Sequence, residues 1–301
     1  MNITKYEKYF FILPLILSLL AVAAIVLWGL KPGIDLSGGS LLQVTYTDAR
    51  PAAEAIHEAV EPLNLGEVRV QPTGESGYIL RQRDLTNDER NTLLSTLGTL
   101  GKVQEDQFNS VGPIIGQELL RKAWIAITLV VVLIIAFIAF AFRGVSKPVA
   151  SWKYGIVAIV TLLHDILVPL GLFAALGHFF GAEVDALFIV ALLTILGISI
   201  NDTIVVFDRI RENLRLNEEH HKRESYDEVV GRSIVQTIAR SINTSMTVII
   251  VLAALYFLGP AATKNFALTL IVGMVAGTYS SIFLASPMLV VWERFSNRKS
   301  G

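Results

Sequence analysis

The feature that most constrains the fold is an apolar run, residues 186–213, that carries a carboxylic acid inside it. A membrane-spanning helix needs roughly 20 mainly apolar residues. Asp202 lies within such a length, between Asn201 and Thr203. An ionised carboxylate at the centre of a bilayer costs about 3 kcal/mol on insertion scales, so Asp202 must face other helices or water, take up a proton, or meet a cation. An acid in this position indicates a functional site.

The composition is that of an integral membrane protein. Of the 301 residues, 53% are hydrophobic and only 17% are charged, against about 25% charged in ordinary soluble domains. The net charge of −1 provides no basic field, so we expect no nucleic-acid partner. The chain has no cysteine, and its five histidines show no metal-ligand spacing, so we expect neither a metal nor a cofactor.

Six apolar runs are long enough to cross a membrane. The first, residues 9–30, exceeds the apolar core of a signal peptide, so we expect an uncleaved span, although small residues at 21–24 leave cleavage open. The others lie near residues 123–142, 154–176, 186–207, 238–258 and 265–291. The predicted organisation is a first transmembrane helix at 1–30, a polar domain at 31–122 and a five-helix transmembrane domain at 123–301.

The polar segment between the first two spans predicts a small α+β domain. Its order of strand, helix, strand, strand, helix, strand is typical of a ferredoxin-like fold. Thr86, with Glu89 three residues later, has the pattern of an N-terminal capping box. We expect strands near 41–46, 67–73, 77–83 and 102–110, and helices near 51–61 and 86–97.

The fifth span places a second charged residue at the membrane. Its cleanly apolar part, 248–258, is too short to cross a bilayer at about 1.5 Å per residue, and Pro260 blocks extension forward. The helix must therefore reach back to about Arg240, at or just inside the edge of the hydrocarbon. Asp202 and Arg240 lie on the two arms of one helical hairpin, so we expect them to be neighbours.

The charges of the short loops predict the orientation in the membrane. The loops at 177–185 and 259–264 hold only Lys264, whereas the opposite loops and the C-terminal end are basic. We therefore expect both termini in the cytoplasm and the polar domain outside it. The basic residues behind this prediction are Arg143, Lys147, Lys153, Arg209, Arg211, Arg215, Lys222, Arg223, Arg232, Arg294, Arg298 and Lys299.

Polar residues recur around Arg240 at three- and four-residue steps, which puts them on one side of a helix. Lipid cannot satisfy such a stripe, so it must face protein or water. Two interpretations stay open: hydrogen bonds between helices, worth about 1 kcal/mol each, or a hydrated proton path that includes Asp202. The stripe consists of Ser233, Gln236, Thr237, Arg240, Asn243, Thr244 and Thr247.

Asp202 and Arg240 together suggest a proton switch. Arg240 stays protonated at any accessible pH, and when close it favours a charged Asp202. An apolar environment without that cation favours the protonated acid instead. We hypothesise that Asp202 loads and releases a proton as the helix packing alternates. The alternative is a static buried ion pair.

A second polar position is His164–Asp165, midway along the third span. Pro169 cannot donate to the carbonyl of Asp165, so a polar notch forms there. The notch is either a secondary proton relay or ion site, or a locally satisfied kink. No Ser/His/Asp set converges in the polar domain and no P-loop lysine follows a Gly-rich turn, so we expect no enzyme.

Several motifs resemble a known family. They are Gly33-Ile-Asp35-Leu-Ser-Gly38-Gly39, Val111-Gly112-Pro113-Ile-Ile-Gly116, His164-Asp165, residues 201–213 and Arg240-Ser241-Ile242-Asn243-Thr244-Ser245. Over essentially the whole chain the sequence resembles the SecF members of the SecD/SecF family. These are membrane subunits of the bacterial protein-export machinery, related to the resistance-nodulation-division transporters.

The resemblance implies a half-transporter in the bacterial inner membrane that uses the proton-motive force to help export proteins. The implied partners are SecD in a heterodimer, the SecYEG channel, the translocating preprotein, protons and the lipid bilayer. By match of motif, Asp202 and Arg240 would be the proton-coupling pair, accompanied by Asn201, Thr244 and Thr247.

Two alternative functions stay open. A small-molecule exporter half of the same superfamily would need a substrate cavity, and one compact domain of about 90 residues makes a poor funnel. A membrane scaffold or assembly subunit would use the ion pair only to fix helix packing, and neutralising Asp202 would leave its activity intact.

Overall fold

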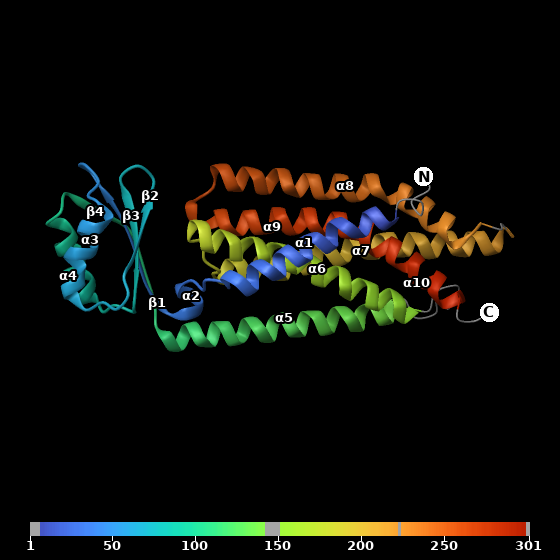
Figure 1. Ribbon diagram of the computed structural model, residues 1–301, viewed down its shortest axis with the longest axis horizontal. Coiled ribbons are helices and arrows are strands. Elements are labelled where there is room, and N and C mark those ends of the chain that lie inside the picture. Colours follow the sequence, from blue (N-terminus) through green and yellow to red (C-terminus); the bar gives the residue numbers. More distant parts are fainter. Residues whose placement is uncertain (1–6, 142–150, 222–223, 299–301) are drawn as a thin grey trace. The chain divides into compact units, whose positions relative to one another are not determined.

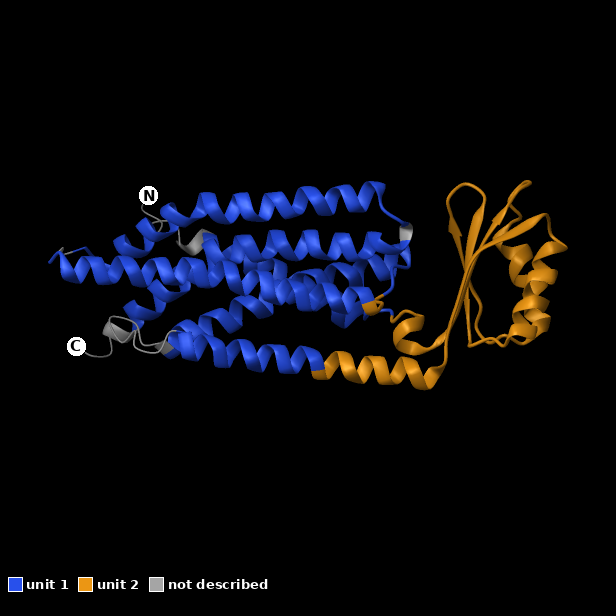
Figure 2. Cartoon of the chain, turned by 180° about the vertical axis from the view of Figure 1, so that it is seen from behind, with its two compact units in different colours: residues 1–31, 126–183, 187–301 blue, residues 32–125, 184–186 orange. Residues whose placement is uncertain are grey.

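The computed structural model describes residues 7–141, 151–221 and 224–298. The chain divides into two compact units (Figure 2). We call residues 1–31, 126–183 and 187–301 the helical unit, and residues 32–125 with 184–186 the head unit. The domain boundaries inferred from the sequence, at 30/31 and 122/123, stay predictions. Phe142 at the end of the second predicted span, and the loop charges at Arg143, Lys147, Lys222, Arg223 and Lys299, lie outside the described residues.

Six helices among the described residues are long and apolar enough to cross a membrane, which confirms the predicted number of spans. Several are longer than predicted, because polar turns extend the apolar cores at their ends. The sixth span is not one regular helix, since a π-helical turn interrupts it. In order (Figure 1), the spans are formed by α1 (Glu7–Trp28), α5 (Pro113–Ala141), α6 (Ser151–Phe180), α7 (Ala186–Glu219), α8 (Tyr226–Leu258), and α9 (Ala261–Ser280) continued by η3 (Ser281–Ala285) and α10 (Ser286–Arg298).

The helices of the helical unit approach closely where glycines face a neighbour. A Cβ atom at Gly171 of α6 would lie 2.3 Å from the Cα atom of Ala21 on α1. A Cβ atom at Gly273 of α9 would lie 2.2 Å from the Cδ1 atom of Ile195 on α7. Small residues at such crossings let helix backbones pack tightly inside a membrane.

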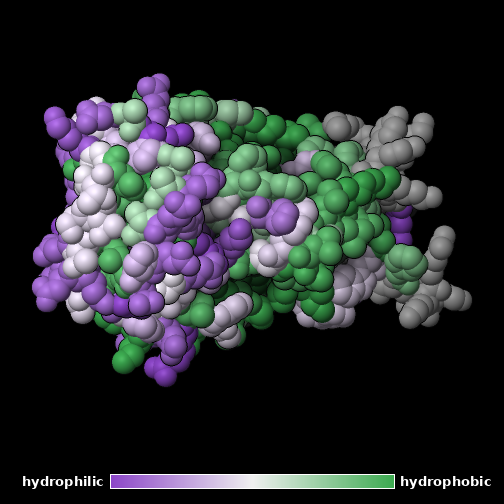
Figure 3. All heavy atoms as spheres, turned by 60° about the vertical axis from the view of Figure 1, so that its left-hand side comes forward, coloured by the Kyte–Doolittle hydropathy of each residue, from purple (hydrophilic) through white to green (hydrophobic). Residues whose placement is uncertain are grey.

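The spans differ in how much of their surface other helices cover. Only 11% of the most apolar window of α5 is buried, against 61% of that window in the last span. The last span is therefore central in the helical unit, and α5 presents its apolar side chains outward. Figure 3 shows such apolar side chains over the visible face of the helices, whereas hydrophilic side chains gather over the head unit.

The head unit is an α+β sandwich of the predicted type. Its four strands are β1 (Gly39–Tyr46), β2 (Arg69–Thr73), β3 (Gly77–Gln82) and β4 (Val103–Val111), in the order β2-β3-β1-β4 with every neighbouring pair antiparallel. Each βαβ crossover skips one strand, as in the split βαβ arrangement of ferredoxin-like folds. Helices α3 (Ala53–Val60) and α4 (Asn87–Gly98) bury apolar residues against one face of this sheet.

The start of α4 confirms the predicted capping box. The Thr86 hydroxyl accepts a hydrogen bond from the Glu89 amide, and the Glu89 carboxylate accepts one from the Thr86 amide at 2.9 Å. A hydrogen bond from the Arg83 guanidinium, together with the Thr86 contacts, lowers the pKa of Glu89 to about 2. Because this pKa is lower in the folded state, the charged Glu89 carboxylate adds to the free energy of unfolding. This contribution is complete above about pH 4.5 and is lost as the pH falls toward 2.

The glycine motif before β1 is a tight junction within the head unit. A short helix, α2 (Ile34–Ser37), lies inside the motif, and Gly38 and Gly39 follow it with positive φ angles of 77° and 127°. A Cβ atom at Gly38 would lie 2.6 Å from the Cα atom of Pro113, and one at Gly116 would lie 2.5 Å from the Gly38 amide nitrogen. The glycines are therefore needed where the chain enters the sheet and leaves it for α5.

We expect Gly116→Ala to destabilise the protein by about 1–3 kcal/mol, because the new methyl group would overlap the backbone of Gly38. The matched control is Gly155→Ala, also within a helix, whose methyl group would meet only the Ile138 side chain at 3.8 Å. Replacing a helical glycine by alanine without a clash stabilises by up to about 1 kcal/mol. Thermal unfolding of the detergent-solubilised chain should therefore shift in opposite directions, and a Gly116→Ala protein as stable as the Gly155→Ala protein would refute the junction.

Candidate functional site

Asp202 lies on α7, with its side chain half-buried against α8. Its Oδ1 atom accepts a hydrogen bond of 2.8 Å from the Ser241 hydroxyl. Its Oδ2 atom is buried and has no hydrogen-bond partner among the described residues. The carboxyl group is therefore only half satisfied in this structure, and its free oxygen can take a proton or a further donor.

Polar contacts at the ends of α7 and α8 bring Asp202 to this place. Arg209 on α7 donates through Nε to Gln236 of α8 at 2.7 Å, and Asn213 donates to Ser233 at 2.8 Å. Asn213 also donates to Gln236 at 2.8 Å. These bonds fix the register of the two helices, so that Asp202 meets Ser241 further along the pair.

Helix α8 begins well before the position that the sequence analysis required. Ser225 and Glu228 form a capping box, so the helix starts at Tyr226 and continues through Arg240 to Leu258. The prediction that the fifth span reaches back to Arg240 is confirmed. The cap explains why it reaches further, because it satisfies the first backbone amides of the helix.

Arg240 does not pair directly with Asp202 in this structure. The described residues contain no ion pair of 4 Å or less between the two side chains, and Arg240 is exposed on α8. Its neighbour Ser241 contacts the acid instead. The two helices thus meet at the predicted position, while the role of the Arg240 guanidinium stays a prediction.

The polar stripe of α8 divides into two parts. Ser233 and Thr237 are buried and form hydrogen bonds within the helical unit. The remaining members are exposed, and so is Asn201 on α7. This exposed polar face of α7 and α8 comprises Asn201, Gln236, Arg240, Asn243, Thr244 and Thr247.

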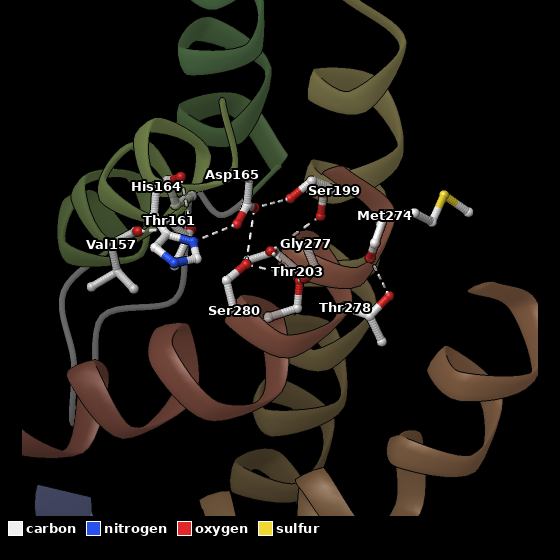
Figure 4. A network of polar contacts seen from close by, with 12 residues as sticks. Val157, Thr161, His164, Asp165, Ser199, Thr203, Met274, Gly277, Thr278 and Ser280 are labelled. Atoms are coloured by element: carbon white, nitrogen blue, oxygen red, sulfur yellow. Dashed lines mark hydrogen bonds and ion pairs between the residues drawn. The ribbon is translucent and has the colours of Figure 1, made fainter. Parts of the chain in front are cut away.

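Asp165 is the centre of a second polar site, buried where α6, α7 and the last span meet (Figure 4). Its side chain is 0% exposed. The hydroxyls of Ser199 on α7 and Ser280 on α9 both donate to its Oδ2 atom, Ser280 at 2.9 Å. The Nδ1 atom of His164 lies 2.9 Å from its Oδ1 atom. The notch predicted at His164–Asp165 is thus a fully enclosed network.

Ser280 could not be identified as a member of this network from the sequence. Ser280 and Ser281 lie where α9 passes into the π-helical turn η3, and Ser281 makes a hydrogen bond of 2.9 Å to Thr203 of α7. A π-helical turn adds one residue to the helix and is frequent at functional sites. No pattern in the apolar run at 265–291 marks this turn, so only the structure shows it.

Among the described residues, no group of three or more His, Cys, Asp or Glu side chains could hold a metal ion. The contacts at the two sites join carboxyl, hydroxyl and imidazole groups, which can exchange protons and hydrogen bonds. A bundle of six apolar helices with two acids within it, joined to a small α+β head, defines a multi-pass membrane protein of a transporter class.

Comparison with known proteins identifies the class more closely. Residues 92–295 match the family described as protein export membrane protein SecD/SecF, C-terminal, and residues 29–49 match the SecD/SecF GG motif. The chain is 41% identical to the protein translocase subunit SecF of Thermobaculum terrenum, over 97% of this chain and 94% of that one. It is 36% identical to the SecF subunit of Anaerolinea thermophila, over the same shares of both chains.

Solved structures agree with this similarity. The crystal structure of SecDF from Thermus thermophilus, described as a translocon-associated membrane protein, superposes with a TM-score of 0.83 at 32% identity. The match covers 98% of this chain but only 39% of the SecDF chain. The chain belongs to the SecD/SecF family, as a protein translocase subunit of the SecF type. It is a transport protein and not an enzyme, as expected.

The two acids should differ in their effect on stability. Asp165→Ala would remove a partner from the buried Ser199 hydroxyl, the Ser280 hydroxyl and the His164 imidazole, although Ser280 keeps its bond to the Gly277 carbonyl. A buried polar group left unsatisfied costs about 1–3 kcal/mol. Asp202→Ala would remove the acceptor of one hydroxyl only. We expect the unfolding temperature of the solubilised chain to fall clearly further for Asp165→Ala. Equal losses would contradict the assignment of Asp165 as the better satisfied acid.

Proposed function

We propose that this chain is the SecF half of a proton-driven machine that assists protein export, and that Asp202 carries the proton. One observation carries the proposal: a half-satisfied carboxyl group lies inside a membrane span beside an exposed polar face that contains an arginine. An intramembrane acid with a free oxygen can bind and release a proton without rearranging its own helix.

The exposed polar face of α7 and α8 supports pairing with a second membrane chain. Arg240, Asn243 and Thr244 lie exposed in a helix that is long and apolar enough to span the membrane, and lipid cannot satisfy their polar groups. A SecD-type chain packed there would supply polar partners. The SecDF chain, of which this chain matches 39%, supports a SecD-type partner because its remaining length can supply that half.

The proposed cycle follows from the charges at this face. With Asp202 ionised, it attracts Arg240 and the polar groups of the partner. Once Asp202 is protonated that attraction is lost, and the two halves shift relative to each other. One elementary charge moved through 100 mV supplies about 2.3 kcal/mol. At about 1.4 kcal/mol per tenfold change, that biases a conformational equilibrium roughly fifty-fold.

We further propose that the chain lies in the bacterial inner membrane with both termini in the cytoplasm and the head unit on the opposite side. The head unit would then contact preproteins that leave the SecYEG channel. The basic residues near the connected ends of α7 and α8, including Arg209, Arg215 and Arg232, support the placement of these helix ends in the cytoplasm.

Asp202→Asn should reduce proton-driven preprotein export to the level seen without this chain. The amide keeps the size of the side chain and the acceptor for Ser241, but it cannot take up a proton. The assay is export of a preprotein by membrane vesicles that contain the chain, its SecD-type partner and SecYEG, with and without a proton-motive force.

Asp208→Asn is the matched control, because Asp208 lies on the same helix and is exposed. This variant should export normally. If Asp202→Asn also exports normally, the scaffold interpretation holds and the proton-carrier proposal fails. Loss of drug efflux with intact export would point to the small-molecule exporter.

The orientation is testable because the chain has no cysteine of its own. In intact spheroplasts, a membrane-impermeant maleimide should label Asn91→Cys on the head unit and should not label Glu218→Cys at the end of α7, both of which are exposed positions. After lysis both should be labelled. The reverse pattern before lysis would overturn the proposed orientation.

A further inference from the structure

The two acids of the helical unit are separate in the sequence but share one helix. Ser199 and Asp202 lie three residues apart on α7, so their side chains project to neighbouring positions on the same face. Ser199 donates its hydroxyl to Asp165, whereas Asp202 accepts from Ser241. Ser199 therefore links the Asp165 site to the turn of α7 that carries Asp202.

A recess between α7, α8 and α9 connects these positions. It has a volume of about 10 Å³, which is about the space that one water molecule needs. Both Ser199 and Asp202 line it, together with Ser245, Gly277 and Thr278. The backbone of Gly277 packs closely against Ser199 at this recess. A Cβ atom at Gly277 would lie only 3.1 Å from the Ser199 hydroxyl oxygen.

Each of the two sites contains one buried polar atom without a hydrogen-bond partner among the described residues. The Oδ2 atom of Asp202 has no hydrogen-bond partner among the residues that the structure describes. The same is true of the Nε2 atom of His164, whose side chain is 4% exposed. A purely structural tie would satisfy its buried polar atoms. Asp202 and the Asp165–His164 pair instead each keep one polar atom that can bind a proton.

We infer that Asp202 and the Asp165–His164 pair form one proton relay, in which Ser199 passes the proton through the recess. This deepens the proposed function and rests on it. Asp202 gives its proton to a water molecule in the recess, which gives a proton to the Ser199 hydroxyl. Ser199 passes its own hydroxyl proton to Asp165. Asp202 is left as an anion and the Asp165–His164 pair has gained one proton.

The surroundings of Asp165 suit this role. The groups that face it are His164 on its own helix, Ser199 on α7 and Ser280 on α9, and His164 is the ionisable group among these three. Asp202 contacts Ser241 through a hydrogen bond, and the charge of the adjacent Arg240 acts on it without direct pairing. None of these partners is a further acid. A proton that passes between the two sites therefore changes the charge of Asp202 and of the Asp165–His164 pair alone.

The two serines on Asp165 provide a matched test. Ser199→Ala and Ser280→Ala each remove one hydroxyl donor from the same oxygen, but only Ser199 lines the recess. In vesicles with the SecD-type partner and SecYEG, we expect Ser199→Ala to lower proton uptake and proton-driven export at least tenfold. Ser280→Ala should retain clearly more uptake and export than Ser199→Ala, because it removes a donor from Asp165 but leaves the recess intact.

A second pair of variants tests the recess without touching Asp165. Met246, the neighbouring residue, is exposed and does not line the recess, so the control Met246→Leu should export normally. Ser245→Leu fills the recess and should lose proton uptake as Ser199→Ala does. This pair decides the matter if Ser199→Ala fails to assemble, since the Ser245 hydroxyl bonds to Thr278 and not to Asp165.

Equal losses in Ser199→Ala and Ser280→Ala would overturn the relay, because the hydroxyls would then act only by holding Asp165. Normal uptake in Ser199→Ala, or in Ser245→Leu, would also overturn it. Asp202→Asn in the same vesicles separates this failure from failure of the proposed function. If Asp202→Asn loses uptake while Ser199→Ala keeps it, only the relay fails; if Asp202→Asn keeps uptake, both fail.

Discussion

The arrangement of the helices depends on the cost of placing a carboxyl group where there is no water. Asp165 meets that constraint by collecting donors from α6, α7 and α9, so three spans are tied at one buried oxygen pair. Asp202 meets it only in part, through a single hydroxyl of α8. An acid whose oxygens all accept hydrogen bonds holds the neighbouring helices together. An acid with one oxygen unbonded can gain a proton there, so the energy of its packing depends on its protonation state.

Under the proposed function, this difference gives the two acids complementary parts in one mechanism. The helix that carries both contacts, α7, is clamped at one end by the hydrogen bonds of Arg209 and Asn213 to α8. Further along, its glycine-lined contacts with α9 allow close packing at Ile195 and Ser199. A change of charge at Asp202 therefore acts on a helix whose neighbours are already fixed. Under the proposed function, this helix would pass the energy of a proton to the surface that meets the partner chain.

Much of the fold follows from the sequence because its signals are local. The six apolar runs, the strand and helix order of the head unit and the Thr86–Glu89 cap each depend on residues close together in the chain. The site is harder to predict, because its hydrogen bonds join helices far apart in the sequence. Asp202 and Asp165 stand out as acids in apolar runs, but nothing local shows that Ser199 and Ser280 serve Asp165. The exposure of Arg240 is likewise not visible in the local pattern, because it depends on how α7 and α8 pack.

The central claim is that Asp202 changes its protonation state while its helix packing changes. Infrared difference spectroscopy of the aspartate-labelled chain, reconstituted with its SecD-type partner, measures this directly as the pH is lowered. The account predicts a carbonyl band of a protonated aspartic acid that grows on acidification and is absent from the Asp202→Asn protein, together with a change in the amide bands. An Asp202→Asn protein with the same difference spectrum as the unaltered chain would contradict it.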